Sequence, residues 1–153
     1  MAIRVGVVMD PIAAVNYKKD STLAMLWAAA ARGWELGYME QGDLHLRNGP
    51  RALCRPLTVF RDPSRWFELG TATDVPLTEF DVILMRKDPP FDMAYVAATY
   101  ILQRAEDSGA LVVNRPASLR DANEKAFIAW FPQCTPPTLI TSSVRELRAF
   151  HDE

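Results

Sequence analysis

The sequence predicts an α/β fold: a Rossmann-like, three-layer domain with a mainly parallel sheet and an inserted β-hairpin. Three runs, at residues 3–9, 80–85 and 110–114, are mostly apolar and rich in β-branched side chains, as in strands buried on both faces of a parallel sheet. Apolar residues at helical spacing fill much of the sequence between these runs. Strands and helices should therefore alternate, which is the order of a doubly wound sheet.

The first strand and helix have clear boundaries. Residues 3–9 should form a strand that stops at Asp10, because Pro11 has no N–H to donate to a ladder and favours extended backbone in the residue before it. A helix is expected over residues 21–32. It should end at Gly33, a residue that adopts the left-handed backbone of a helix end without strain. The helix cap is expected at position 20 or 21.

The pattern changes after a second strand, which we expect at residues 34–40. Over residues 42–70, apolar and polar positions alternate around Asn48-Gly49, a pair typical of a tight hairpin turn. We interpret this stretch as a small β-hairpin that leaves the sheet. The hairpin either has no chemical role or binds an anion through a set of arginines. Those arginines are Arg47, Arg51 and Arg55.

A second strand–helix–strand unit should follow. Residues 80–85 and 110–114 predict buried strands, and residues 92–108 predict the helix between them, closed by Gly109. Most of the apolar surface of this helix is expected from Tyr95, Val96, Thr99, Tyr100 and Leu102.

Shorter elements are expected after residue 115. Ser118 with Asp121, and Ser143 with Glu146, each have the spacing of a capping box, so a helix should begin at each serine. Another helix is expected over 125–131 and a possible strand over 136–141.

The best candidate for a domain boundary is residues 133–138, where a proline pair separates the α/β layer from a new strand and helix. This pattern predicts one domain over 1–133 and the beginning of another over 134–153.

Composition narrows the classes of function. The chain has 153 residues, is 49% hydrophobic and carries a formal net charge of −2, so no global field favours nucleic acid or an anionic membrane. Any anionic ligand must be held locally. Cys54 and Cys134 lie far apart, without a CxxC pattern, which argues against a zinc site and for reduced thiols in a cytoplasmic protein.

Several catalytic motifs are absent from the sequence. There is no GxGxxG, no GxxxxGK[ST] and no GxSxG, so dinucleotide binding, P-loop phosphate binding and a hydrolase nucleophile have no support. His45 and His151 are expected at the surface. The large aromatic residues are interpreted as core side chains, because no basic stripe accompanies them. They are Trp27, Trp66, Trp130 and Phe131.

Polar side chains follow three of the predicted strands, and each group then meets a proline. They are Asp10 after the first strand, Arg86, Lys87 and Asp88 after the strand at 80–85, and Asn114 and Arg115 after the strand at 110–114. Ligands of open parallel sheets bind beyond the carboxyl ends of the strands, and rigid loops lose less entropy on binding. We therefore expect these groups to bind a substrate at one rim.

The individual groups suit an anion. Arg86 can grip a carboxylate through two parallel hydrogen bonds, Lys87 supplies a point charge, and Asp88 can orient one of them or receive an amine. The alternative is an exposed ion pair at a strand end, worth little. Lys125 fits either a nucleotide phosphate or a solvated lysine beside Glu124.

A series of motifs extends over most of the chain. In order, they are VMDPI, KKDST, GYMEQGDL, DVILMRKDPPFD, ATYILQRAE, VVNRPASLRDANEKAF and AWFP. Together they resemble the amino-terminal region of bacterial glutathione synthetase over nearly all of residues 3–150. The run DVILMRKDPPFD is the most specific, and residues 47–74 match least.

This resemblance implies an ATP-grasp ligase that joins γ-glutamylcysteine to glycine, using ATP and Mg²⁺ through an acyl-phosphate intermediate. It implies that this chain is the pre-ATP-grasp α/β domain, which helps to form the active site and the contacts of a homo-oligomer. Carried over to this sequence, Lys125 resembles the family's first nucleotide-phosphate lysine. Asp10, Arg86, Lys87 and Asp88 lie in loops that face the substrate. No catalytic or metal-binding residue is carried over.

The sequence departs from the family in length. Members are considerably longer, and beyond the matching region they carry a glycine-rich phosphate loop, a second nucleotide lysine and the carboxylates that hold magnesium. We therefore expect a truncated protein that is inactive alone, because ATP and Mg²⁺ both need the missing half. Two alternatives stay open: a binding or assembly module without catalytic duty, and an ATP-grasp ligase for a different peptide or amino acid.

Overall fold

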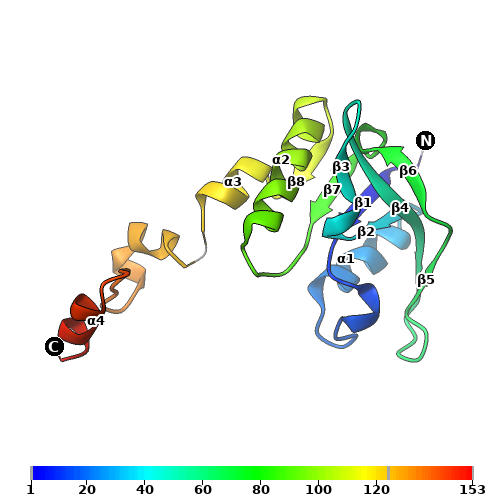
Figure 1. Cartoon of the computed structure of the whole chain (residues 1–153). Coiled ribbons are helices and arrows are strands. Elements are labelled where there is room, and N and C mark those ends of the chain that lie inside the picture. The colour runs from blue at the N-terminus through cyan, green and yellow to red at the C-terminus, as the bar shows by residue number, and fades with distance from the viewer. Residues whose placement is uncertain (1, 124, 153) are drawn as a thin grey trace.

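The computed structural model describes residues 2–123 and 125–152. Figure 1 shows an α/β body that extends to α3, with the later residues lying away from it. The strands are β1 (Arg4–Val8), β2 (Glu35–Met39), β3 (Leu44–Leu46), β4 (Pro50–Val59), β5 (Phe67–Leu69), β6 (Thr73–Pro76), β7 (Val82–Met85) and β8 (Leu111–Val113). The α-helices are α1 (Ser21–Ala30), α2 (Met93–Asp107), α3 (Pro116–Asp121) and α4 (Val144–His151).

The centre of the sheet is parallel, as the apolar runs predict. Within the described chain the strand order is β3-β4-β2-β1-β7-β8, and β5 and β6 both pair with β4. The ladders β2–β1, β1–β7 and β7–β8 are parallel; Val7, for example, pairs with Tyr38 on one side and Leu84 on the other. The carboxyl ends of these strands therefore meet at one edge.

The hairpin lies where the sequence predicts it, but its place in the sheet differs. Asn48 and Gly49 form the turn with φ of 54° and 117°. However, β4 pairs antiparallel with β2 and carries β3, β5 and β6, so it extends the main sheet instead of leaving it. The sheet is consequently mixed, with a parallel centre and antiparallel ladders around β4. The local pattern indicates a hairpin turn but contains no information about which distant strand β4 joins.

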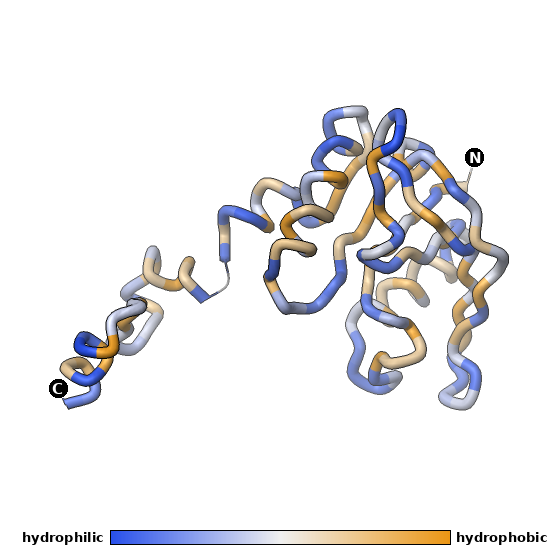
Figure 2. Tube along the Cα trace, viewed as in Figure 1, coloured by the Kyte–Doolittle hydropathy of each residue, from blue (hydrophilic) through white to orange (hydrophobic). Residues whose placement is uncertain are grey.

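The two faces of the sheet have separate cores, and α1 and α2 cover them (Figure 1). Val7 packs in the core with Leu26 of α1, whereas Val8 packs in the core with Leu102 of α2. Adjacent residues of one strand thus face opposite helices, which explains why the strand is apolar throughout. Figure 2 shows the central strands as mostly hydrophobic.

The helix caps agree with the sequence. The Asp20 carboxylate accepts a hydrogen bond from the backbone N–H of Leu23 at 2.6 Å, and the Asp92 carboxylate accepts one from Tyr95 at 2.8 Å. Each cap satisfies an amide that has no partner within its helix.

Two predictions about the second unit are wrong. The strand at 110–114 is not buried on both faces: β8 is the edge strand of the sheet, and Leu111 and Val113 are 59% and 39% exposed. Tyr100 points outward from α2 and is 55% exposed, while Ala98 and Ala105 supply buried contacts instead. Periodicity does not reveal whether a strand has a neighbour.

The carboxyl-terminal part differs most from expectation. Helix α3 begins at Pro116, so Ser118 lies within it and does not cap it. The helix expected over 125–131 is a 3₁₀ turn at Phe127–Trp130, and no strand occurs at 136–141. Ser143 does cap α4, accepting from the N–H of Glu146 at 3.4 Å.

None of the described residues after Pro116 is buried. Trp130 and Phe131 are 68% and 46% exposed, so their interpretation as core residues is wrong. Trp27, a residue of α1, and Trp66, which donates to the Ile12 carbonyl in the loop after β1, are both partly buried. Hydrophobic stretches nevertheless recur in residues 125–152 (Figure 2).

Within the described residues, no helix has the length and apolar character needed to cross a membrane.

Candidate functional site

The polar residues after the three parallel strands lie at one rim of the sheet. Strands β1, β7 and β8 are consecutive neighbours in the sheet and point the same way, so Asp10, Arg86 and Asn114 all follow carboxyl ends at the same edge (Figure 1). The geometric expectation of a shared rim is therefore confirmed. What each side chain binds stays a prediction.

Asp10 connects two of the loops at this rim. Its Oδ1 atom lies 2.9 Å from Nζ of Lys87, and its Oδ2 atom accepts the backbone N–H of Asp88 at 2.9 Å. Lys87 also donates to the backbone carbonyl of Asp88 at 2.5 Å. The Lys87 charge is thus balanced by Asp10, and the pair braces the β1 loop against the β7 loop.

Arg86 has a different environment. Its Nε atom donates to Oγ1 of Thr22 at 3.0 Å, and its Nη2 atom donates to Oγ of Ser21 at 2.9 Å. Both acceptors are neutral hydroxyls at the start of α1. No described carboxylate forms an ion pair with this guanidinium. The positive charge of Arg86 is therefore oriented without being neutralised.

The loop after β1 is anchored through Ile12. Its backbone N–H donates to the Tyr38 hydroxyl at 3.3 Å, and its carbonyl accepts from Nε1 of Trp66 at 3.1 Å. Burial is the main cause, and the hydrogen bond to Glu40 the second, of a Tyr38 pKa well above its usual value, so the phenol stays neutral. These contacts hold the loop that carries Asp10. No sequence signal identifies them, because they join residues far apart in the chain.

A cavity of about 750 Å³ opens beside the β7 and β8 loops. It brings together the residues that the sequence singles out, except Asp10, and the apolar side chains of Phe91 and Leu119 also line it. The polar residues that line it include Arg86, Lys87, Asp88, Asn114, Arg115 and Lys125. Such a wall, cationic with apolar patches, suits an organic anion.

Asp10 lines a neighbouring cavity of about 530 Å³, together with Asp20 and Thr22 at the start of α1. Arg86 and Asp88 line both cavities. The end of β7 therefore separates two adjoining spaces, and Arg86 borders each of them.

Helix α3 is held against α2 by Arg120. The guanidinium of Arg120 lies 4.4 Å from the ring centroid of Tyr100, and its nitrogens donate to Oγ1 of Thr99 at 3.1 Å and to Oε1 of Gln103 at 3.4 Å. Tyr100, although exposed, thus carries a cation over its ring, an arrangement that stabilises both. These contacts fix the α3 wall of the larger cavity.

Residues 3–120 match the family model described as "Prokaryotic glutathione synthetase, N-terminal domain". The chain belongs to the prokaryotic glutathione synthetase family. It is 63% identical to a glutathione synthetase of Pseudomonas putida, 61% to one of Pseudomonas aeruginosa and 58% to one of Yersinia pestis. These alignments cover 99%, 100% and 99% of this chain and 49%, 49% and 48% of the relatives. The chain spans about half the length of the curated relatives it matches.

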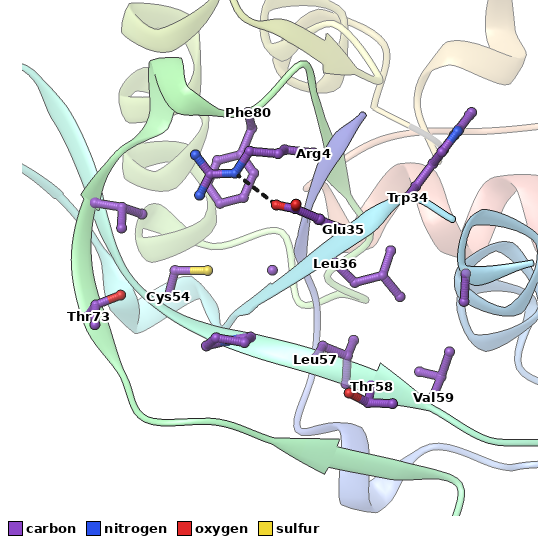
Figure 3. A pocket seen from close by; sticks show the side chains of 14 residues that line it. Arg4, Trp34, Glu35, Leu36, Cys54, Leu57, Thr58, Val59, Thr73 and Phe80 are labelled. Carbon is purple, nitrogen blue, oxygen red and sulfur yellow. Dashed lines mark ion pairs between the residues drawn. The ribbon is translucent and has the colours of Figure 1, made fainter. Parts of the chain in front are cut away.

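A further cavity of this glutathione synthetase domain, of about 440 Å³, lies at the opposite end of the parallel strands (Figure 3). Figure 3 shows Arg4 beside the ring of Phe80, with Cys54 facing the same space. Arg4 is paired with Glu35 at 3.7 Å and Glu79 at 2.8 Å. Because its cation is already balanced, this cavity suits an anion less well than the rim does.

Of the three hairpin arginines, Arg51 is already engaged, whereas Arg47 and Arg55 are exposed and form no ion pair with a described acid. Nε of Arg51 lies 3.0 and 3.1 Å from the two carboxylate oxygens of Asp74, and Nη2 donates to the Asp74 carbonyl at 3.1 Å. This pair joins β4 to β6, so Arg51 acts within the fold. His45, expected at the surface, is partly exposed and lies 3.4 Å from the same carboxylate.

Cysteine chemistry and metal binding have little support in the described part of this glutathione synthetase domain. Both cysteines are free thiols, as expected; Cys54 is buried and Cys134 is exposed. No group of three or more His, Cys, Asp or Glu side chains among the described residues could hold a metal ion.

Lys125 lies at the cavity beside the β7 and β8 loops with its side chain exposed, whereas Glu124, its suggested partner, lies outside the described residues.

Proposed function

We propose that this domain forms the substrate side of a glutathione synthetase that joins γ-glutamylcysteine to glycine and converts ATP to ADP and phosphate in the cytoplasm. The observation that carries the proposal is the cationic cavity at the carboxyl ends of β7 and β8, in a chain that belongs to this family. γ-Glutamylcysteine has two carboxylates, and ATP has a polyphosphate, so both ligands need cations.

The residues at the rim divide these tasks. Arg86, with its unbalanced charge, binds a substrate carboxylate, and Asn114, which lines the same cavity, offers an amide donor. Lys87 and Asp10 form the frame that positions the backbone of Asp88, whose carboxylate can receive the substrate amine. Lys125, which lines the same cavity, contacts a phosphate of ATP.

ATP supplies the phosphoryl group that activates the substrate carboxylate, and Mg²⁺ balances the phosphate charge. In this proposal the ligands of Mg²⁺ and most of the ATP site belong to a second, ATP-grasp half. The α/β domain then covers residues 1–133, residues 134–153 begin the ATP-grasp domain, and the 153-residue chain alone makes no glutathione. Exposed aromatic side chains such as Trp130 are then available to pack against the second half.

A fusion tests this division of labour. Residues 1–153 are joined to the half of the Pseudomonas putida relative that lies beyond its matching region. We expect ATP-dependent consumption of γ-glutamylcysteine and glycine by the fusion but not by the chain alone. Arg86→Met should raise the KM for γ-glutamylcysteine, and Lys125→Met should raise the KM for ATP. A fully active 153-residue chain, or a folded fusion without activity, would refute the proposal.

Assembly is the second candidate function, and the exposed apolar edge at Leu111 and Val113 favours it. A domain that only holds together subunits of a homo-oligomer would show unchanged kinetics in the Arg86 and Lys125 variants. Its oligomers would dissociate in sedimentation experiments with Leu111→Asp. Assays of the same fusion with other amino acids as acceptors test the remaining alternative, a ligase of different specificity.

A further inference from the structure

The contacts of Arg86 point to a role for two residues of α1 that no motif identifies. Thr22 is only 4% exposed, and its hydroxyl accepts from Nε of Arg86 at 3.0 Å. Ser21 is exposed, and its hydroxyl accepts from Nη2 at 2.9 Å. The two acceptors occupy two of the five N–H donors of the guanidinium. The other three are left for a ligand.

Neutral hydrogen-bond acceptors affect the charge of a guanidinium differently from carboxylates. Lys87, one residue later, is balanced by Asp10 at 2.9 Å and is only 18% exposed, so its charge is largely used within the fold. A carboxylate beside Arg86 would cancel its charge in the same way. Two hydroxyls fix the plane of the guanidinium and leave its full positive charge.

The position of the guanidinium beside a helix end also favours a bound anion. It lies at the amino end of α1, where the helix dipole is positive and repels a cation. Asp20, the N-cap of this helix, and Asp88 line the same cavity as Arg86, but neither forms an ion pair with it in the described structure. The neighbouring rim acid, Asp10, is paired with Lys87. An anion in the cavity would therefore gain from both Arg86 and the helix end.

We propose that Thr22 and Ser21 are positioning residues, which hold the Arg86 guanidinium at the wall between the two cavities so that it can bind a carboxylate of the substrate. The choice of a carboxylate rests on the proposed function. Neither hydroxyl needs to touch the ligand. Their contribution is to order a long side chain before the ligand arrives, which lowers the entropic cost of binding.

The test uses the ¹⁵N-labelled 153-residue chain and follows the Nε–H signal of Arg86, assigned by its loss in Arg86→Lys. Glutarate, a simple dicarboxylate, is the probe. We expect glutarate to shift this signal and Thr22→Val to raise the dissociation constant roughly ten-fold, the scale of one hydrogen bond to a charged group. Thr22→Ser keeps the hydroxyl and should bind like the unmodified chain. Thr58→Val removes an exposed hydroxyl of β4 and should also bind normally.

A second variant guards against a folding defect. Ser21→Ala alters an exposed side chain and should weaken glutarate binding by a smaller factor. In the Arg86→Lys background neither substitution should weaken binding further, because each acts through the guanidinium. Unchanged affinity in Thr22→Val and Ser21→Ala, a loss that Thr22→Ser does not restore, or an Arg86 signal that glutarate does not move would each overturn the positioning role.

A parallel titration with γ-glutamylcysteine separates this inference from the proposed function. If glutarate binds through Arg86 and γ-glutamylcysteine does not, the proposed function fails and the positioning role stands. If γ-glutamylcysteine binds with an affinity that Thr22→Val leaves unchanged, the positioning role fails and the proposed function stands.

Discussion

The Nζ atom of Lys87 lies 2.9 Å from Oδ1 of Asp10, which joins the loops after two adjacent parallel strands. The second carboxylate oxygen of Asp10 holds the backbone of the β7 loop. One acid thus fixes both the charge and the backbone of the neighbouring loop. The contacts of Asp10 therefore order the backbone that directly follows Arg86.

Asp10→Asn should lower the free energy of unfolding by about 1 kcal/mol. The amide oxygen of asparagine can still accept the N–H of Asp88, but Lys87 loses the charge of its partner. Urea unfolding followed by circular dichroism measures the effect. Asp121→Asn, at an exposed acid of α3, is the matched control and should change stability little. Equal effects of the two substitutions would show that the Asp10 pair contributes nothing.

Gly37→Ala should destabilise the domain by about 1–3 kcal/mol, the usual effect of overpacking. A Cβ atom at this position would lie 2.7 Å from Sγ of Cys54 and 2.8 Å from the Phe80 ring, so both side chains would have to move. Gly42→Ala is the control, because a Cβ there meets nothing within 4 Å. A thermal melt that leaves both variants at the midpoint of the unmodified chain would contradict this packing.

The two thiols should differ in reactivity towards iodoacetamide. Cys134 is exposed and should be alkylated rapidly at pH 8, whereas Cys54 is buried and burial raises its pKa to about 11, so little thiolate is present. Mass spectrometry of the native chain should show one added group, and alkylation in urea should add two. Rapid double alkylation of the folded chain would mean that Cys54 is accessible.

Stability should fall between about pH 9 and pH 11. The pKa of Cys54 rises on folding from 9.0 to about 11, so in this window the unfolded chain releases a proton that the folded chain keeps. The contribution is fully present below pH 9 and is lost as the pH approaches 11. Denaturant unfolding at several pH values should give a shallower decline for Cys54→Ala than for Cys134→Ala. Tyr38, whose pKa is also raised, adds to the decline in both variants.

Local sequence patterns predict well the central strands of the sheet and the two helices that cover them. The run at residues 3–9 alternates between two covered faces, and the proline after Asp10 ends it, so both the strand and its polar end can be predicted. The shared rim follows from the direction of the parallel strands alone. The positions of the candidate site residues in these loops can therefore be predicted from the sequence.

Contacts between segments that lie far apart in the chain cannot be predicted from these local patterns. Thr22 meets Arg86 across 64 positions, and Arg51 meets Asp74 across 23, and neither pair has a local signature. The place of β4 in the main sheet and the open edge at β8 are likewise decided by tertiary pairing. The aromatic residues near Trp130 resemble core residues by type alone, yet no layer formed by the described residues covers them.

The most direct measurement is a titration of the ¹⁵N-labelled chain with γ-glutamylcysteine, followed through every assigned backbone amide. The amides of Asp10, Arg86 and Asn114 should shift together with a single dissociation constant. Those of Gly37 and Thr58, at the cavity on the opposite end of the sheet, should stay in place. Shifts confined to that second cavity, or no shifts at all, would contradict the account of the rim as the substrate site.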